Sequence, residues 1–559
     1  MPDLAFNSRR SPVYGRRGMV AASQPLAVAA GLEILAAGGA AADAAVATAA
    51  ALNVTEPVST GIGGDCFALY YEAVTGQVTA LNGSGRAPAG LTLARLAREG
   101  FGAGAPLPPY HPYTITVPGA CAGWCDIVER FGKLPLAKIL APAIRLAEEG
   151  FPVALITAYH WARGAERQLR HASGGRELTI DGRGPRPGEI FRNPGLAGTL
   201  RTVAEGGKDA FYRGEIAAAI AETVQSAGGC LTIEDLAGHH STWDEPISVT
   251  YHPFGVAQDK GVRVWECPPN GQGLTALLAL NLLEGFDLTG PSTGSGRGLD
   301  PLGPERLHLE IEALRLAFAD AHWYIADPTF SSVPIPQLLS KEYATERRKL
   351  INPKRATLDQ QRGAPAASSD TVYFCVVDGA GNACSFINSN YMGFGTGIVP
   401  AGRGFTLQNR GHNFSLAPDH PNGVAPGKRP YHTIIPGMLT RLSDGALIGP
   451  FGVMGGFMQP QGHVQVVVAL ANDQLDPQSA LDRPRFCISD GTAGGQVGIE
   501  EGIPPQTLRA LQTLDHPAYA VSGHDRALFG RGQIILRDPE TGVLCGGSDP
   551  RADGCAMSL

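Results

Sequence analysis

The sequence lacks the features that mark several common classes of protein. Charged residues make up only 17% of its 559 residues, the net charge is −7, and no basic stripe is present, which argues against nucleic-acid binding. No apolar run is long enough to cross a bilayer. The N-terminal segment does not combine an apolar core with a cleavage site, so no secretory signal is indicated. We therefore expect a cytoplasmic protein without membrane or nucleic-acid partners.

Signatures of metal, nucleotide and serine-hydrolase sites are also missing. The chain has no H-E-x-x-H. It has no G-x-S-x-G elbow, because its one match, "GPSTG" (290–294), falls in a stretch expected to be a long flexible loop. "GIGGD" (61–65) lacks the Lys-Ser/Thr of a phosphate loop. Ten cysteines are scattered, and the one close pair, Cys121 and Cys125, fits neither zinc nor redox spacing, so free buried thiols are expected. The sequence thus predicts no metal and no cofactor. A Ser-His-Asp triad stays open, because 14 histidines are present and no motif marks one of them.

Glycine (73) and proline (43) are abundant, which is typical of a chain with many tight turns. Helical patterns are frequent in the first part. Ser23 is expected to cap a helix with Pro25 in its first turn, an Ala-rich helix should surround Asp43, and apolar spacing predicts a long helix after Pro304. "TITVPG" (114–119) alternates like a strand.

The pattern changes at Thr371. Residues 353–370 are polar and rich in Pro, Ala and Ser, as in an exposed, mobile linker. "TVYFCVVD" (371–378) and "NACSFIN" (382–388) then flank a Gly-containing turn, which predicts a β-hairpin. A threonine hydroxyl is a weak nucleophile, but a cut before it would free an α-amino group with a pKa of roughly 7.7–8.0 to act as base. By itself this pattern is weak, because threonine is common at strand starts.

Several ordered motifs decide between these interpretations. They are "GLEILAAGGAAADAAVA" (31–47), "PVSTGIGGDCFALYY" (57–71), "TVPGACAGW" (116–124), "LAFADAHWYIADP" (316–328), "DTVYFCVVDGAGNACSF" (370–386), "GFGTGIV" (393–399), "GKRPYHTIIP" (427–436), "VMGG" (453–456) and "PQSALDRPRF" (477–486). Through these motifs the chain resembles, nearly end to end, the γ-glutamyltransferase superfamily of autoprocessed N-terminal nucleophile hydrolases.

The resemblance implies an α/β fold, a four-layer αββα sandwich. It also implies cleavage between Asp370 and Thr371 into a large subunit, 1–370, and a small subunit, 371–559, with a dimer of such heterodimers as a compatible assembly. Position by position, it assigns the nucleophile to Thr371 and a hydroxyl partner to Ser389. The backbone N–H groups of Gly455 and Gly456 would form an oxyanion hole.

The chain departs from typical transpeptidases where they hold the γ-glutamyl group. Ser84 stands at the position of an arginine, with Arg86 two residues later, and Asn413 replaces an acidic residue. The pattern is nearer to the branch with glutaryl-cephalosporin acylases and oxamate amidohydrolase. The substrate contacts implied are Arg86, Tyr391, Arg410, Asn413, His432 and Thr433. Arg410 is equally well read as a solvated surface charge, and His412 and His432 as hydrogen-bonded scaffold.

The sequence leaves three alternative functions to compare. The leading one is an autoprocessed amidohydrolase or acylase acting on small-molecule amides, with γ-glutamyl hydrolase or transferase activity as an addition. The second is a γ-glutamyltransferase that acts on glutathione. The third is an unprocessed scaffold without activity, against which the retained Thr371, Ser389 and glycine pair argue.

Overall fold

Two antiparallel sheets form the centre of the molecule in a computed structural model that describes residues 10–253, 261–288, 299–359 and 370–559. The first has seven strands in the order β19 (Cys555–Ser558), β2 (Gly18–Ala22), β10 (Asp370–Asp378), β11 (Ala383–Tyr391), β3 (Asp65–Glu72), β4 (Gln77–Gly83) and β7 (Thr242–Asp244). The second also has seven, in the order β1 (Val13–Gly15), β18 (Leu544–Ser548), β17 (Arg531–Arg537), β13 (Leu447–Met454), β12 (Gly437–Arg441), β9 (Val262–Glu266) and β8 (Ile247–Tyr251).

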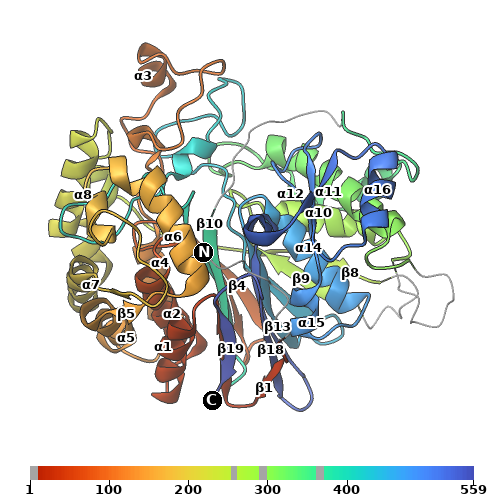
Figure 1. Ribbon diagram of the computed structural model, residues 1–559, viewed down its shortest axis with the longest axis horizontal. Helices are drawn as coiled ribbons and strands as arrows, with labels where there is room; N and C mark the ends of the chain where they lie inside the picture. The colour runs from red at the N-terminus through yellow and green to blue at the C-terminus, as the bar shows by residue number, and fades with distance from the viewer. Residues whose placement is uncertain (1–9, 254–260, 289–298, 360–369) are drawn as a thin grey trace.

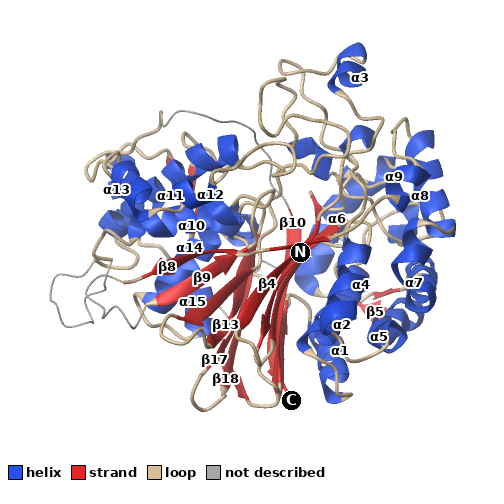
Figure 2. Cartoon of the chain, turned by 180° about the vertical axis from the view of Figure 1, so that it is seen from behind, coloured by secondary structure: helices blue, strands red, loops and turns tan. Residues whose placement is uncertain are grey.

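Helices cover the outer face of each sheet (Figures 1 and 2). The layer on the first sheet contains α1 (Pro25–Ala36), α2 (Ala41–Thr55), α4 (Ala120–Phe131), α5 (Leu136–Glu149), α6 (Leu155–Arg167), α7 (Pro194–Tyr212) and α8 (Glu215–Ser226). The layer on the second contains α10 (Gly273–Leu283), α11 (Pro304–Tyr324), α13 (Lys341–Arg348), α14 (Met458–Ala471), α15 (Pro477–Asp482) and α16 (Pro505–Thr513). The order helix, sheet, sheet, helix is the four-layer αββα sandwich predicted from the sequence.

Strand β10 shows how the sequence builds the two inner interfaces. Val372, Phe374 and Val376 pack with the helices of the first layer, whereas Tyr373 and Cys375 pack between the sheets. This alternation of buried side chains is what a strand covered on both faces requires. The hairpin to β11 is confirmed, and it turns at Gly381, whose φ of 87° favours glycine.

The helical predictions hold for the most part. Helix α2 surrounds Asp43 and is buried along its whole length, and α11 begins at Pro304. The predicted Ser23 cap is wrong. Gln24 occupies the N-cap position, and Ser23 Oγ instead donates to the buried Glu56 carboxylate at 2.6 Å.

The strand expected over 114–119 is also wrong. Residues Pro112–Thr114 form a short 3₁₀ helix, and Val117 bonds to the Arg86 carbonyl outside any sheet. Of the predicted linker, residues 360–369 lie outside the described residues. Among those that are described, no helix has both the length and the apolar character needed to cross a membrane.

Candidate active site

Thr371 lies at the start of β10, fully buried, beside Ser389 near the end of β11. The two hydroxyl oxygens are 3.0 Å apart. The pairing of the strands is irregular here, since Asp370 pairs with Tyr391 but Val372 pairs with Asn388. Tyr391 adopts a φ of 78°, which is uncommon for a residue with a bulky side chain. Irregularities of this kind redirect side chains next to functional sites, and here one brings Ser389 to Thr371.

Ser389 Oγ is surrounded by donors. It accepts the N–H of Tyr391 at 2.9 Å and the Nη2–H of Arg410 at 3.1 Å. These two donors occupy its lone-pair side, which favours donation of the Ser389 proton to an acceptor such as Thr371 Oγ1. The arrangement leaves the Thr371 proton available to a base.

Arg410 is a buried group of this cluster and is not on the surface. Its Nη1 donates to Thr433 Oγ1 at 2.7 Å, and its guanidinium carbon lies 4.4 Å from the centre of the Tyr391 ring. Burial lowers the pKa of Arg410 to about 10, and the Asp65 carboxylate opposes that shift. Arg410 therefore stays charged at neutral pH and fixes both Ser389 and Thr433.

The sequence analysis missed Asp65, which holds this cluster from the other side. Asp65 is fully buried at the start of β3, and its Oδ2 lies 3.1 Å from His432 Nε2 and 3.8 Å from Arg410 Nε. Its Oδ1 accepts the Gly85 N–H at 2.8 Å. An acidic residue directly after "GIGG" was the available signal, because a charge entering a buried strand requires a partner.

Asn413 and Tyr391 form a separate pair at the edge of the cluster. The Tyr391 hydroxyl donates to Asn413 Oδ1 at 2.5 Å, and Asn413 Nδ2 donates to the Tyr431 carbonyl at 3.0 Å. Burial raises the pKa of Tyr391 to about 12, so the phenol stays neutral and remains a donor. The Asn413 amide is thus bonded at both ends.

Gly455 and Gly456 form the turn between β13 and α14, with φ values of 132° and 60°. Within the described part of the chain, their two N–H groups donate to no protein acceptor. Gln272 holds the turn, since its Nε2 donates to the carbonyls of Gly456, at 2.8 Å, and Thr433, at 2.6 Å. The turn therefore presents two backbone donors, as an oxyanion hole requires.

Arg86 does not join this hydrogen-bonded cluster. It is half-buried and donates to the His240 carbonyl at 3.0 Å. Ser84 is fully buried and donates to Asn82 Oδ1 at 2.7 Å. The cation that touches Ser84 is Arg429, whose Nε donates to the Ser84 carbonyl at 3.1 Å.

A cavity of about 560 Å³ adjoins the cluster at Asn413 and Tyr431. Its other walls are largely apolar and aromatic and include Leu107, Trp323, Phe414, Leu416 and Phe457. Burial lowers the pKa of the three histidines in its wall, His322, His412 and His420, so they are neutral at pH 7. The cavity is suited to a large uncharged group.

The buried histidines predict how stability depends on pH. Burial lowers the pKa of His432 to about 3, against an ordinary value of 6.5. Below pH 6.5 the unfolded chain takes up a proton that the folded chain excludes, so stability falls as the pH falls from 6.5 toward 3. The slope is up to about 1.4 kcal/mol per pH unit for this histidine. We expect the free energy of unfolding, measured with denaturant, to fall between pH 6.5 and 5 by about 2 kcal/mol less in His432→Gln than in wild type.

The matched control for this measurement is His171→Gln at an exposed histidine, which should keep the wild-type pH dependence. Identical pH profiles for His432→Gln and wild type would contradict a buried, neutral His432.

The fold and the site together define an N-terminal nucleophile amidohydrolase, and comparison with known proteins identifies its family. The chain belongs to the gamma-glutamyltranspeptidase family, whose profile matches residues 27–559. It is 35% identical to the "Glutathione hydrolase-like YwrD proenzyme" of Bacillus subtilis (strain 168), over 98% of this chain and 99% of that one. It is 34% identical to the "Oxamate amidohydrolase proenzyme" of Klebsiella pneumoniae, over 96% and 98%.

Among solved structures, the crystal structure of cephalosporin acylase from Bacillus halodurans superimposes with a TM-score of 0.89. It is 47% identical and covers 100% of this chain and 99% of that chain. The enzymatic relatives argue against an inactive scaffold.

Proposed function

We propose that the chain cuts itself between Asp370 and Thr371 and that the new N-terminal threonine hydrolyses small-molecule amides. The observation that carries this proposal is the buried Thr371 hydroxyl, bonded to Ser389 and supported by Arg410. In the uncut chain, Thr371 Oγ1 attacks the Asp370 carbonyl carbon. The Asp370–Thr371 C–N bond then breaks, which leaves an ester on Oγ1 and frees the α-amine, to which the hydroxyl proton passes. Water hydrolyses that ester, releases the Asp370 carboxylate and restores the Thr371 hydroxyl.

Turnover uses the same atoms. The α-amine of Thr371 takes the hydroxyl proton as Oγ1 attacks the substrate carbonyl, and the oxyanion is stabilised by the N–H groups of Gly455 and Gly456. The proton passes to the leaving amine as the C–N bond breaks, which leaves an acyl ester on Thr371. Water activated by the amine hydrolyses the ester and releases the acid.

We further propose that the acyl group lacks the α-ammonium of a γ-glutamyl group. Asn413 carries no charge, and both ends of its amide are occupied. The nearest carboxylate of the described cluster, Asp65, is engaged by His432 and Arg410. A buried ammonium would lack a charge partner here at a cost of about 1–3 kcal/mol, whereas a glutaryl-type acyl group avoids that cost.

Two measurements test these proposals. N-terminal sequencing of the smaller chain should read Thr-Val-Tyr-Phe, and any other start would remove Thr371 as nucleophile. For a matched pair of anilides, kcat/KM should favour glutaryl over γ-glutamyl by roughly ten-fold to a hundred-fold. A strong preference for the γ-glutamyl anilide would instead support glutathione hydrolysis, the function printed in the name of one relative.

A further inference from the structure

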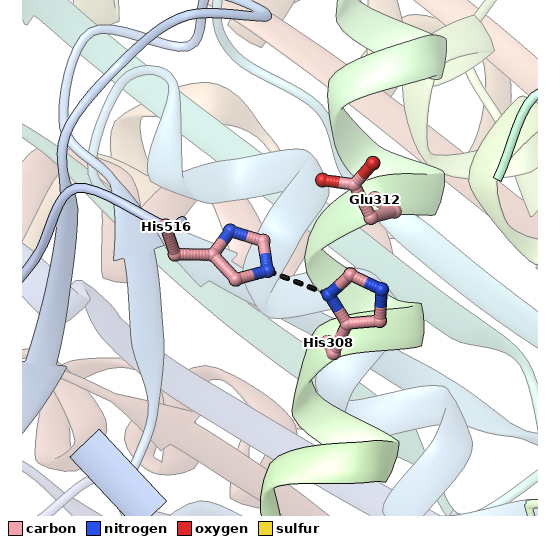
Figure 3. A group of neighbouring side chains, drawn as sticks. All are labelled: His308, Glu312 and His516. Carbon is pink, nitrogen blue, oxygen red and sulfur yellow. Dashed lines mark hydrogen bonds between the residues drawn. The ribbon is translucent and has the colours of Figure 1, made fainter. Parts of the chain in front are cut away.

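Three buried side chains outside the active site converge between α11 and the segment just before β16 (Ala518–Val521) (Figure 3). His308 and Glu312 lie one turn apart on α11, and His516 approaches them from the C-terminal part of the chain. Each is at most 3% exposed, and one potential ligand atom from each lies within 4.8 Å of the others. Their separation in sequence explains why no motif predicted them.

The hydrogen bonds fix the protonation of His308. Its Nε2 lies 2.8 Å from the Asn352 carbonyl, which can only accept, so this nitrogen carries a proton. The Nδ1 lone pair of the neutral ring then faces His516 Nε2 at 2.7 Å. A ring held by a carbonyl on one nitrogen, with its lone pair directed into a cluster, is the arrangement of a metal-binding histidine.

Two other polar atoms of the cluster have no hydrogen-bond partner within the described residues. They are Glu312 Oε1 and His516 Nδ1, on side chains that are almost completely buried. Glu312 Oε2 accepts the Thr357 N–H at 3.0 Å. Arg315 Nε lies 3.5 Å from Oε1 without a hydrogen bond, while its two Nη atoms donate to the carbonyls of Ala493 and Gly495. A buried carboxylate oxygen without a hydrogen bond is costly, and a cation bound at Glu312 Oε1 would compensate it.

A surface hollow of about 420 Å³ lies beside the cluster. Asn352 and Thr357, which bond to His308 and Glu312, line this hollow, as does Asp515, the residue before His516. Asp359 and Arg355 also line it, and Arg355 is paired with Asp515 at 2.7 Å. This hollow is the side from which a cation would enter.

We propose that His308 Nδ1, Glu312 and His516 Nε2 bind one divalent cation of the zinc class. Two imidazoles and a carboxylate are ligands that zinc accepts, with water as the fourth. The cation takes the place of the proton between the two rings. His308 Nδ1 and His516 Nε2 must therefore move apart, from 2.7 Å to the roughly 3.3 Å that separates two ligand atoms of a tetrahedral zinc ion. The displaced proton moves to His516 Nδ1, and a proton held by Glu312 leaves to solvent.

The position of the site gives the ion a structural task. Under the proposed cleavage, His308 and Glu312 belong to the large subunit and His516 to the small one. The segment that contacts the site, Asn352 to Thr357, lies within 20 residues of the proposed cut. A bound ion therefore ties the end of the large subunit to the small subunit.

The test uses the full chain, with any affinity tag removed and metal stripped by a chelator. Zinc titrated against a competing chelator should bind at one ion per chain and raise Tm. Glu312→Gln and His516→Gln should each weaken binding by about 100-fold or more, while His171→Gln, at an exposed histidine, should not.

Cobalt distinguishes metal binding at this site from metal binding by the ten free cysteines. Co²⁺ in the wild-type protein should give visible bands of a four- or five-coordinate ion without the near-ultraviolet band of a cobalt–thiolate bond. This measurement uses only the wild-type protein, so it tests the site even if a substituted variant does not fold. A thiolate band, or zinc binding by His516→Gln as tight as wild type, would overturn the proposal without touching the amidohydrolase function.

Discussion

Thr371→Ala is expected to leave the protein as one uncut chain of 58.4 kDa without amidase activity. In the proposed mechanism one hydroxyl carries out both acyl transfers, and alanine removes it while leaving β10 and its packing in place. The loss in kcat should be about 10⁴-fold or more, as for other enzymes that lose their nucleophile. Mass spectrometry of the intact protein and an anilide assay measure the two effects.

Two further variants make this result specific. Thr371→Ser keeps a hydroxyl and should still be cut and retain activity. Thr48→Ala removes another fully buried threonine hydroxyl, in α2, and should mature and turn over like wild type. If Thr371→Ala were cut and active, the nucleophile would have to be sought elsewhere, for instance in a serine triad.

Asp65→Asn is expected to have the second largest effect. The substitution keeps the size of the side chain but leaves the buried Arg410 cation without its nearest carboxylate. Removing one partner of a buried ion pair costs about 3–5 kcal/mol in the free energy of unfolding. Because Arg410 holds both Ser389 and Thr433, kcat should also fall, by about 100-fold.

A positioning role for Asp65 predicts a change that lost stability alone does not explain. Asp65 supports the charge of Arg410, whose pKa is about 10, so the alkaline limb of the kcat profile should move to lower pH in Asp65→Asn. The control is Asp444→Asn, which breaks an exposed pair with Arg441 and should leave stability close to that of wild type. Wild-type stability and an unmoved alkaline limb in Asp65→Asn would rule out this role.

Local patterns predicted much of the fold correctly. The β10–β11 hairpin, the buried Ala-rich helix and the helix beginning at Pro304 each follow from periodicity and turn residues within a short window. The two wrong predictions share a cause. Ser23 and the 114–119 segment have the local pattern of a cap and a strand, but distant groups, Glu56 and the Arg86 carbonyl, bind them instead.

The candidate site divides in the same way. Thr371 and Ser389 lie in one hairpin and could be named from the sequence and its family resemblance. Arg410 was open between a site residue and a surface charge, and the structure buries it against Ser389. Arg86 was named as a substrate contact, but its described hydrogen bond goes to His240.

The sequence alone determined the family and the αββα fold and indicated Thr371 as the nucleophile, because ordered motifs and a strand beginning at a threonine are local features. Only the tertiary structure decided which charges support that nucleophile. Asp65 and His432 are 367 positions apart, and His308 and His516 are 208 apart. Burial makes such partners necessary, since a charge removed from water must find compensation wherever the fold brings it, and no local pattern records that distance.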